Sequence, residues 1–90
     1  MTTAEINAAI AESMGWHFDA EFPEYPWMDG EGEGHRSIPD FHGSLDAIVP
    51  VIRALDEDDF ESVMDWLGYR VLATPAQWSE AYLRWKGLWK

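Results

Sequence analysis

The stretch DEDDFESVMDWLG, residues 56–68, decides the fold class of this chain. Its apolar residues recur at the spacing i, i+3, i+4 and i+7, which predicts an amphipathic α-helix: Phe60, Val63, Met64 and Leu67. Asp56 stands at the N-cap position, and the three acids after it fill the first turn, where the helix dipole favours negative charge. Gly68 is a typical helix stop.

The following stretch, TPAQWSEAYLRWKGLW, residues 74–89, predicts a second helix of the same kind. Thr74 is an N-cap, Pro75 takes the first helical position and Gln77 completes a capping box. Large apolar residues then form one stripe, which is typical of a core-facing side: Trp78, Ala81, Tyr82, Trp85 and either Leu88 or Trp89. Between the two helices, residues 69–73 are expected to be extended and to form a short strand.

Two more helices are predicted upstream. Ser44 is expected to cap one whose stripe is Leu45, Ile48, Val49, Ile52 and Leu55, and Pro50 inside it should kink the helix because it removes a backbone hydrogen bond. The first helix is predicted over residues 3–14. Thr2 and Glu5 form its capping box, and Gly15 stops it.

Residues 17–42 have no helical period, and prolines and glycines interrupt them. They also carry six large apolar residues, which a disordered segment would lack: Phe18, Phe22, Tyr25, Trp27, Ile38 and Phe41. A wrapped aromatic loop is predicted, with a small β-hairpin turning from Asp29-Gly30 through Gly34. We therefore predict a mainly α single domain over residues 1–90, with four helices and a long aromatic loop; an α+β fold is the alternative.

Charge and composition exclude several function classes. The chain has 17 acidic and 6 basic side chains, for a net charge of −11. Residues 1–65 hold 16 acids and two arginines, a net −14, whereas residues 66–90 hold four basic residues and one acid, a net +3. Such acidity opposes direct binding to nucleic-acid phosphates. The absence of cysteine excludes disulfides, a thiolate zinc site and a cysteine nucleophile. With no long apolar run and no signal-peptide pattern, we expect no membrane contact and a cytoplasmic location.

One motif suggests a metal. In DGEGEGHRSIPD, residues 29–40, oxygen ligands fall at positions 1, 3, 5, 9 and 12 with glycine at 6, as in a calcium-binding EF-hand loop. Arg36 occupies the usual apolar position, Pro39 blocks the helix that should follow, and position 12 is the shorter Asp. We predict a solvated acidic turn without metal; the candidate ligands, if one bound, are Asp29, Glu31, Glu33 and Asp40. The three histidines, His17, His35 and His42, lack zinc-site spacing and are interpreted as isolated surface residues.

No pattern favours catalysis. The serines lack a nucleophile elbow, and the glycines of residues 30–34 lack the strand and helix that flank a phosphate-binding loop. A carboxylate pair for glycoside hydrolysis can be picked from any two of 17 acids, so it carries no information. We therefore expect a protein that is not an enzyme and has no cofactor.

Several segments resemble one family. They are Met14-Gly15-Trp16, Ile38-Pro39-Asp40-Phe41 leading into Ser44-Leu45-Asp46-Ala47, and Ala73-Thr74-Pro75-Ala76-Gln77-Trp78 through Gly87-Leu88-Trp89. In order and spacing they resemble small proteins of tailed phages and prophages related to the phage ABA-sandwich domain. The resemblance implies a phage origin and a layered α/β fold, and it supplies no catalytic residues.

These observations lead to a functional hypothesis. A small acidic phage protein is expected to bind a host defence protein with a basic surface, such as a CRISPR–Cas effector, and to block its nucleic-acid-binding groove in the host cytoplasm. Glu61 and Asp65 are one helical turn apart, so their negative charges repel and mildly destabilise the helix. Helix capping explains the acids of the first turn but does not explain these two. The expected interaction residues are Asp29, Glu31, Glu33, Asp58, Asp59, Glu61, Asp65, Trp27 and Trp66. Trp89 is a further candidate anchor, whereas Trp78 and Trp85 are expected in the core. The alternatives are a ligand- or metal-binding module and a virion or assembly component.

Overall fold

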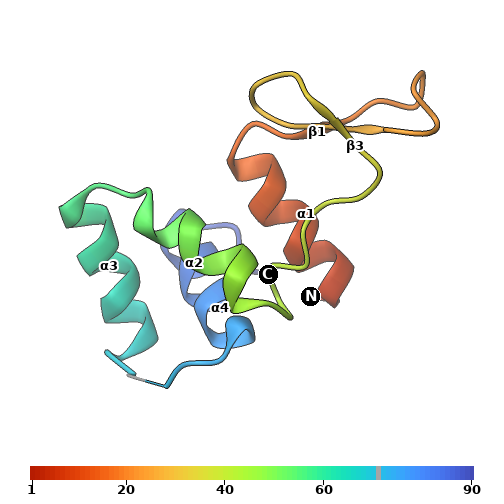
Figure 1. Cartoon of the computed structure of the whole chain (residues 1–90). Helices are drawn as coiled ribbons and strands as arrows, with labels where there is room; N and C mark the ends of the chain where they lie inside the picture. The colour runs from red at the N-terminus through yellow and green to blue at the C-terminus, as the bar shows by residue number, and fades with distance from the viewer. Residues whose placement is uncertain (71) are drawn as a thin grey trace.

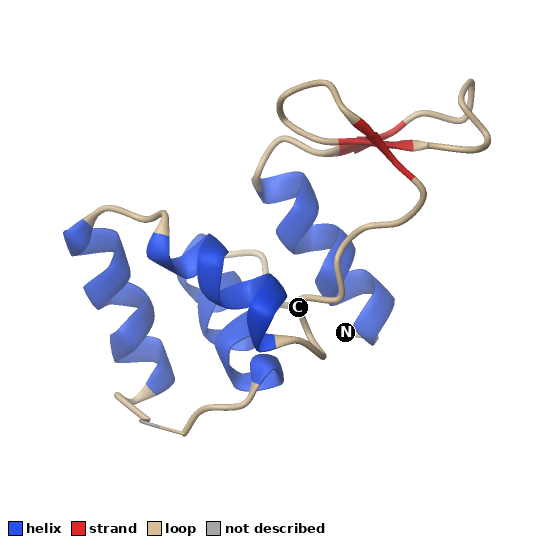
Figure 2. Ribbon diagram, in the orientation of Figure 1, coloured by secondary structure: helices blue, strands red, loops and turns tan. Residues whose placement is uncertain are grey.

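The computed structural model describes residues 1–70 and 72–90, and it confirms a mainly α fold with a small sheet (Figures 1 and 2). The helices are α1 (Thr3–Ser13), α2 (Leu45–Arg53), α3 (Glu57–Leu67) and α4 (Pro75–Lys86). The strands are β1 (His17–Phe18), β2 (Trp27–Met28) and β3 (Gly34–His35). The four helices therefore fall where the apolar periodicity predicts them.

Helix α4 is central to the core, because it packs against each of the other three helices. The buried apolar side chains come from all four helices, from the segment that precedes α2 and from the connection before α4: Ile6, Ile10, Ala11, Phe41, Ile48, Ile52, Val63, Leu67, Ala73, Ala81, Tyr82 and Leu83. Trp78 and Trp85 are partly buried against this core, in line with the positions expected for them. The apolar stripe of α4 is thus the surface on which the other three helices pack.

The predicted hairpin is present, and it gains a third strand. Trp27 pairs with His35 and Met28 with Gly34, both antiparallel, and β1 pairs with the other edge of β2. The sheet extends away from the helices and does not lie between helical layers (Figure 1). The layered α/β arrangement that the resemblance implied is therefore not seen, and the molecule is elongated, at 42 × 25 × 23 Å.

Two contacts attach the sheet to the end of α1. The ring of Trp16 stacks on the imidazole of His35, with centroids 4.7 Å apart and planes at 27°. Gly30 lies so close to α1 that a Cβ there would be 2.9 Å from the carbonyl oxygen of Met14. Gly15, which has a φ of +91°, ends the helix and turns the chain into β1.

The helix ends confirm some of the predicted caps and correct others. Both capping boxes are present, at Thr2–Glu5 and at Thr74–Gln77. Ser44 and Asp56 occupy N-cap positions, but their side chains accept no cap hydrogen bond, so the capping role predicted for them is wrong. Their backbone carbonyls still accept the first helical bonds, that of Ser44 from the N–H groups of Ala47 and Ile48 and that of Asp56 from the N–H of Phe60.

The segment before α2 is held from both sides by polar contacts. Phe41 is buried to 2% exposure, and its carbonyl accepts a hydrogen bond of 3.0 Å from the hydroxyl of Ser79 in α4. Asn7 of α1 accepts a bond from the backbone N–H of His42 and donates one to Asp40. This segment therefore joins the first and last helices.

The short strand expected between α3 and α4 is not found in the described residues of 69–73; Val71 lies outside them. Gly68 and Tyr69 have φ values of +74° and +54°, so the chain turns sharply where an extended strand was expected. The N–H of Tyr69 bonds to the carbonyl of Met64 and closes the end of α3.

Met1 and Lys90 lie close together, since both line the same hollow on the surface (Figure 1). None of the helices in the described part of the chain has the length and apolar character needed to cross a membrane.

Candidate functional sites

One face of α3 is acidic along its length. Asp58, Glu61 and Asp65 follow the spacing i, i+3 and i+7, which places them together on the side opposite the buried Val63 and Leu67. All three are exposed. We call these three residues the α3 acidic face.

In the part of the chain that the structure describes, no ion pair neutralises the α3 acidic face. Among the described residues, the ion pairs are His35 with Asp29 and Arg84 with Glu80, so none involves α3. The charge is felt locally: hydrogen bonding to Asp65, together with the nearby carboxylate of Glu61, raises the pKa of the Tyr69 hydroxyl above its usual value. The face is therefore a source of unbalanced negative potential.

Trp66 flanks the α3 acidic face. Its side chain is 57% exposed, and Asp59, seven residues before it, lies on the same side of the helix. Trp66 borders an open hollow between α3 and α4 that also includes His42, Arg70 and Trp89. Large exposed aromatic rings beside charged groups are typical of binding hot spots.

The other two expected tryptophan anchors are less accessible. Trp27 is half-buried, with its ring edge-on to Phe18 at a centroid distance of 5.4 Å. Trp89 packs against the core, and the guanidinium of Arg84 lies 5.3 Å from its ring. Trp66 is the expected anchor that the fold presents most openly.

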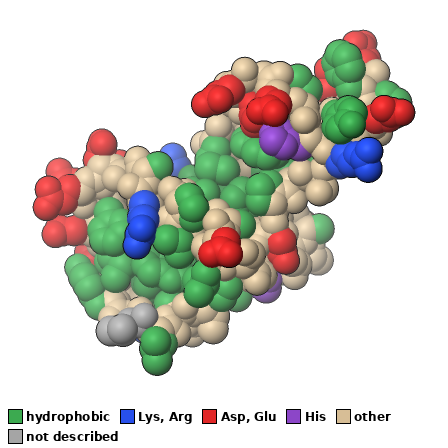
Figure 3. All heavy atoms as spheres, viewed as in Figure 1, with side chains coloured by type: hydrophobic (Ala, Val, Ile, Leu, Met, Phe, Trp, Pro, Cys, Tyr) green, Lys and Arg blue, Asp and Glu red, His purple; other side chains and the backbone are tan. Residues whose placement is uncertain are grey.

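The two acidic stretches expected to act together lie at different ends of the molecule. Residues 29–33 form the turn between β2 and β3, whereas residues 56–65 comprise the N-cap position and most of α3, on the far side of the helices (Figure 1). Figure 3 shows acidic side chains gathered over α3 and, separately, over the sheet. They form two patches and not one continuous face.

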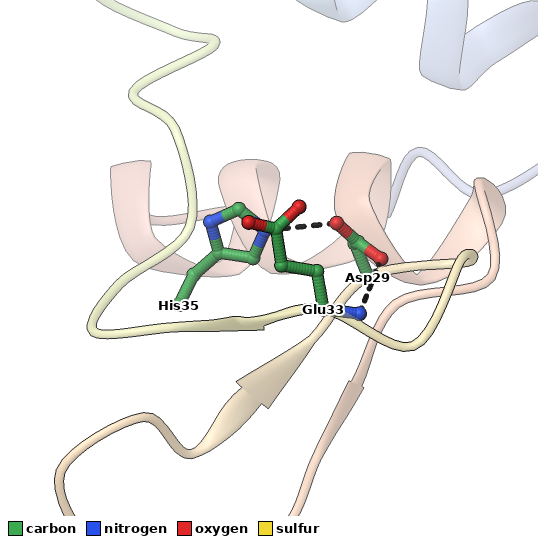
Figure 4. A group of neighbouring side chains, drawn as sticks. All are labelled: Asp29, Glu33 and His35. Carbon is green, nitrogen blue, oxygen red and sulfur yellow. Dashed lines mark hydrogen bonds and ion pairs between the residues drawn. The ribbon is translucent and has the colours of Figure 1, made fainter.

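At the sheet, Asp29, Glu33 and His35 come together, and we call them the hairpin cluster. One potential ligand atom from each lies within 4.8 Å of the other two. The Nε2 atom of His35 is 2.9 Å from Oδ2 of Asp29. Figure 4 shows the three side chains on the same side of the hairpin, facing α1.

Asp29 also shapes the turn. Its Oδ1 atom accepts hydrogen bonds of 2.9 and 3.0 Å from the backbone N–H groups of Glu31 and Glu33. The hydrogen bond from His35 and these backbone bonds lower the pKa of the Asp29 carboxyl. One oxygen therefore holds the turn while the other faces His35.

The remaining metal candidates do not join the hairpin cluster. Glu31 is exposed and is not one of the grouped residues. Asp40 lies before α2, where its Oδ1 atom accepts hydrogen bonds from Asn7 and from the N–H of Gly43. The loop is a hairpin turn and lacks the flanking helices of an EF-hand, so the motif match does not produce that geometry.

The sequence interpretation missed His35, which it treated as an isolated surface histidine. The signal that could have found it is the strand period of two, because Glu33 and His35 point to the same face of an extended chain. Asp29 lies opposite Glu33 across the turn, since its N–H donates to the carbonyl of Glu33. His17, on the outer strand, and His42, before α2, are not part of the hairpin cluster.

Comparison with known proteins gives no relative: the chain matches no protein-family model, no curated protein and no solved structure. The resemblance to phage proteins therefore rests on the motif residues given above.

Proposed function

We propose that this protein is a phage-encoded accessory protein that binds a basic surface on a host protein and blocks it. The observation that carries the proposal is the α3 acidic face, which is exposed, unpaired in the described structure and flanked by Trp66. The protein performs no catalysis in this role. It acts in the host cytoplasm by covering the basic surface of its partner, through its bulk and its negative charge.

The spacing of the charges supports mimicry of nucleic acid. Asp58 and Asp65 are seven residues apart, or about 10 Å along a helix axis. A single strand of DNA places roughly three phosphates over the same distance. Three carboxylates on the α3 acidic face thus approach the linear charge density of one strand. A nucleic-acid-binding defence effector, such as a CRISPR–Cas complex, is the class of target that such a face fits.

Binding of this kind would be steered by charge and anchored by an aromatic ring. Opposite charges speed encounter and make the association sensitive to salt. Trp66 would supply apolar contact area beside the charges, since tryptophan is enriched in hot spots. The acidic turn at residues 29–33 is too far from α3 to share the same contact, so it forms at most a second contact on a large partner.

The proposal is tested by charge reversal with a matched control. The triple variant Asp58→Lys, Glu61→Lys and Asp65→Lys should weaken binding to a purified CRISPR–Cas effector by about 100-fold, at roughly 1 kcal/mol for each reversed contact. The control reverses the exposed Glu12, Glu21 and Glu24 and changes the net charge equally. Equal loss in both triples would show that only net charge matters and would overturn the assignment to α3.

A salt titration and a competition complete the test. The affinity should fall steeply between about 0.05 and about 0.5 M salt, because screening removes the charge contribution. The protein should also displace the effector's nucleic acid. Binding that is unchanged in high salt contradicts the electrostatic mechanism, and a ternary complex that retains the nucleic acid contradicts occlusion.

The alternative of a metal-binding module also has a specific observation in its favour, namely the hairpin cluster.

A further inference from the structure

The hairpin cluster combines an imidazole nitrogen with two carboxylates, a donor set different from that of an acidic turn. Imidazole is a ligand for zinc, copper, iron and nickel, whereas calcium requires six to eight oxygens. We propose that Asp29, Glu33 and His35 form a binding site for a divalent transition-metal ion, with Zn²⁺ as its representative. This site is separate from the α3 acidic face, so it goes beyond the function proposed above.

The distances suit a metal of this class. Zinc binds nitrogen and oxygen ligands at about 2.0–2.2 Å. Two ligands of a tetrahedral ion lie about 3.4 Å apart, so the 2.9 Å hydrogen bond between Nε2 of His35 and Oδ2 of Asp29 has to widen by about 0.5 Å when an ion enters. The carboxylate of Glu33 lies within 4.8 Å of both atoms. Glu33 is exposed, so rotation of its side chain brings it to the ion.

Two of the three ligands are already held in place. Asp29 is fixed through Oδ1 by the backbone N–H groups of the turn, which leaves Oδ2 directed at the cluster. The ring of His35 is fixed by its stack on Trp16. Both ligands are therefore ordered before an ion arrives, which reduces the entropy lost on binding.

The two carboxylates of Asp29 and Glu33, with a neutral imidazole, carry a charge of −2 that balances a divalent ion. In the metal-free protein, Nε2 of His35 carries the proton that it donates to Oδ2 of Asp29, since the carboxylate can only accept. An ion between these two atoms takes the place of that proton on Nε2, and the neutral imidazole then carries its single proton on Nδ1, so the ring changes tautomer without a net release of a proton. Three protein ligands leave at least one position for water.

The test is calorimetric titration of the untagged protein with ZnCl₂. We expect one saturable Zn²⁺ site in the native protein. In Glu33→Gln the Zn²⁺ affinity should be lower by about 10- to 100-fold, because loss of even an outer-shell partner of a metal site lowers the affinity by that much. The side chain of Glu33 makes no hydrogen bond in the described structure, so this variant should retain the fold. The control Glu31→Gln removes the same charge from the same turn and should change the affinity by less than about twofold.

The histidine has its own matched pair. His35→Gln should abolish saturable Zn²⁺ binding, whereas His17→Gln, on the neighbouring strand, should leave it unchanged. An NMR titration with paramagnetic Co²⁺ should perturb resonances of residues 29–35 and Trp16 first. Saturable Zn²⁺ binding that is insensitive to Glu33→Gln and His35→Gln overturns the proposal, as does the absence of binding up to about 1 mM ZnCl₂. Equally tight binding of Ca²⁺ also contradicts the imidazole-containing ligand set.

Discussion

At the scale of single residues, Ser79 shows how one hydroxyl supports the core. It is fully buried, and it donates to the carbonyl of Phe41. Ser79→Ala should lower the free energy of unfolding by about 1–3 kcal/mol, because a buried acceptor loses its partner. Urea denaturation measures this difference. Ser62→Ala is the control, since the hydroxyl of Ser62 donates an exposed hydrogen bond to the carbonyl of Asp58. Similar losses for both variants would contradict the role given to burial.

The carboxyl group of Asp29 should make the stability of the protein depend on pH. Its pKa is lowered in the folded protein, so its stabilising contribution is fully present above the unfolded value of about 3.9 and disappears as pH falls through the lowered folded value. The melting temperatures of the native protein and Asp29→Asn should therefore differ near neutral pH and converge in strong acid. A difference that persists unchanged to the lowest pH would contradict this linkage. Thermal melts monitored by circular dichroism provide the measurement.

At the scale of elements, two of the four helix N-termini have a side-chain cap, at Thr2 and Thr74, and the other two, at Ser44 and Asp56, do not. Thr74 accepts a hydrogen bond from Gln77, whereas the hydroxyl of Ser44 caps nothing. Thr74→Ala should cost about 1 kcal/mol of stability, and Ser44→Ala should cost markedly less. Chemical denaturation of the two variants measures both changes. If Ser44→Ala proved the more costly, the hydrogen-bonded cap would not be what stabilises these helix ends.

The same elements show what the sequence could predict. Helix bounds and the Thr2 and Thr74 capping boxes depend on neighbours three or four residues away, so local patterns predicted them. The β2–β3 hairpin followed from the Asp29-Gly30 turn. Strand β1 and the stack of Trp16 on His35 depend on the sheet's position at the end of α1, which no local pattern encodes. The pairing of His35 with Asp29 was missed for a different reason, because the strand period of two was not applied to residues 33–35 of the predicted hairpin.

At the scale of the whole molecule, uncompensated charge limits stability. The net charge is −11, and the described residues contain the two ion pairs given above. Raising NaCl from about 0.01 to about 0.5 M should increase the melting temperature by several degrees, because screening weakens the self-repulsion of the folded state. Differential scanning calorimetry measures the shift. A melting temperature that falls with salt would show that attractive pairs outweigh repulsion.

The adjacency of Met1 and Lys90 has a consequence for how the chain can be cut and rejoined. Because the two ends already share one hollow, a linker of a few residues would join them with little loss of loop entropy. New ends could open in the exposed connection at residues 20–24, between β1 and β2. Such a circular permutant should keep the helical core, with α1 and α4 now continuous in sequence. The order of the helices along the chain would change, while their packing around α4 would not.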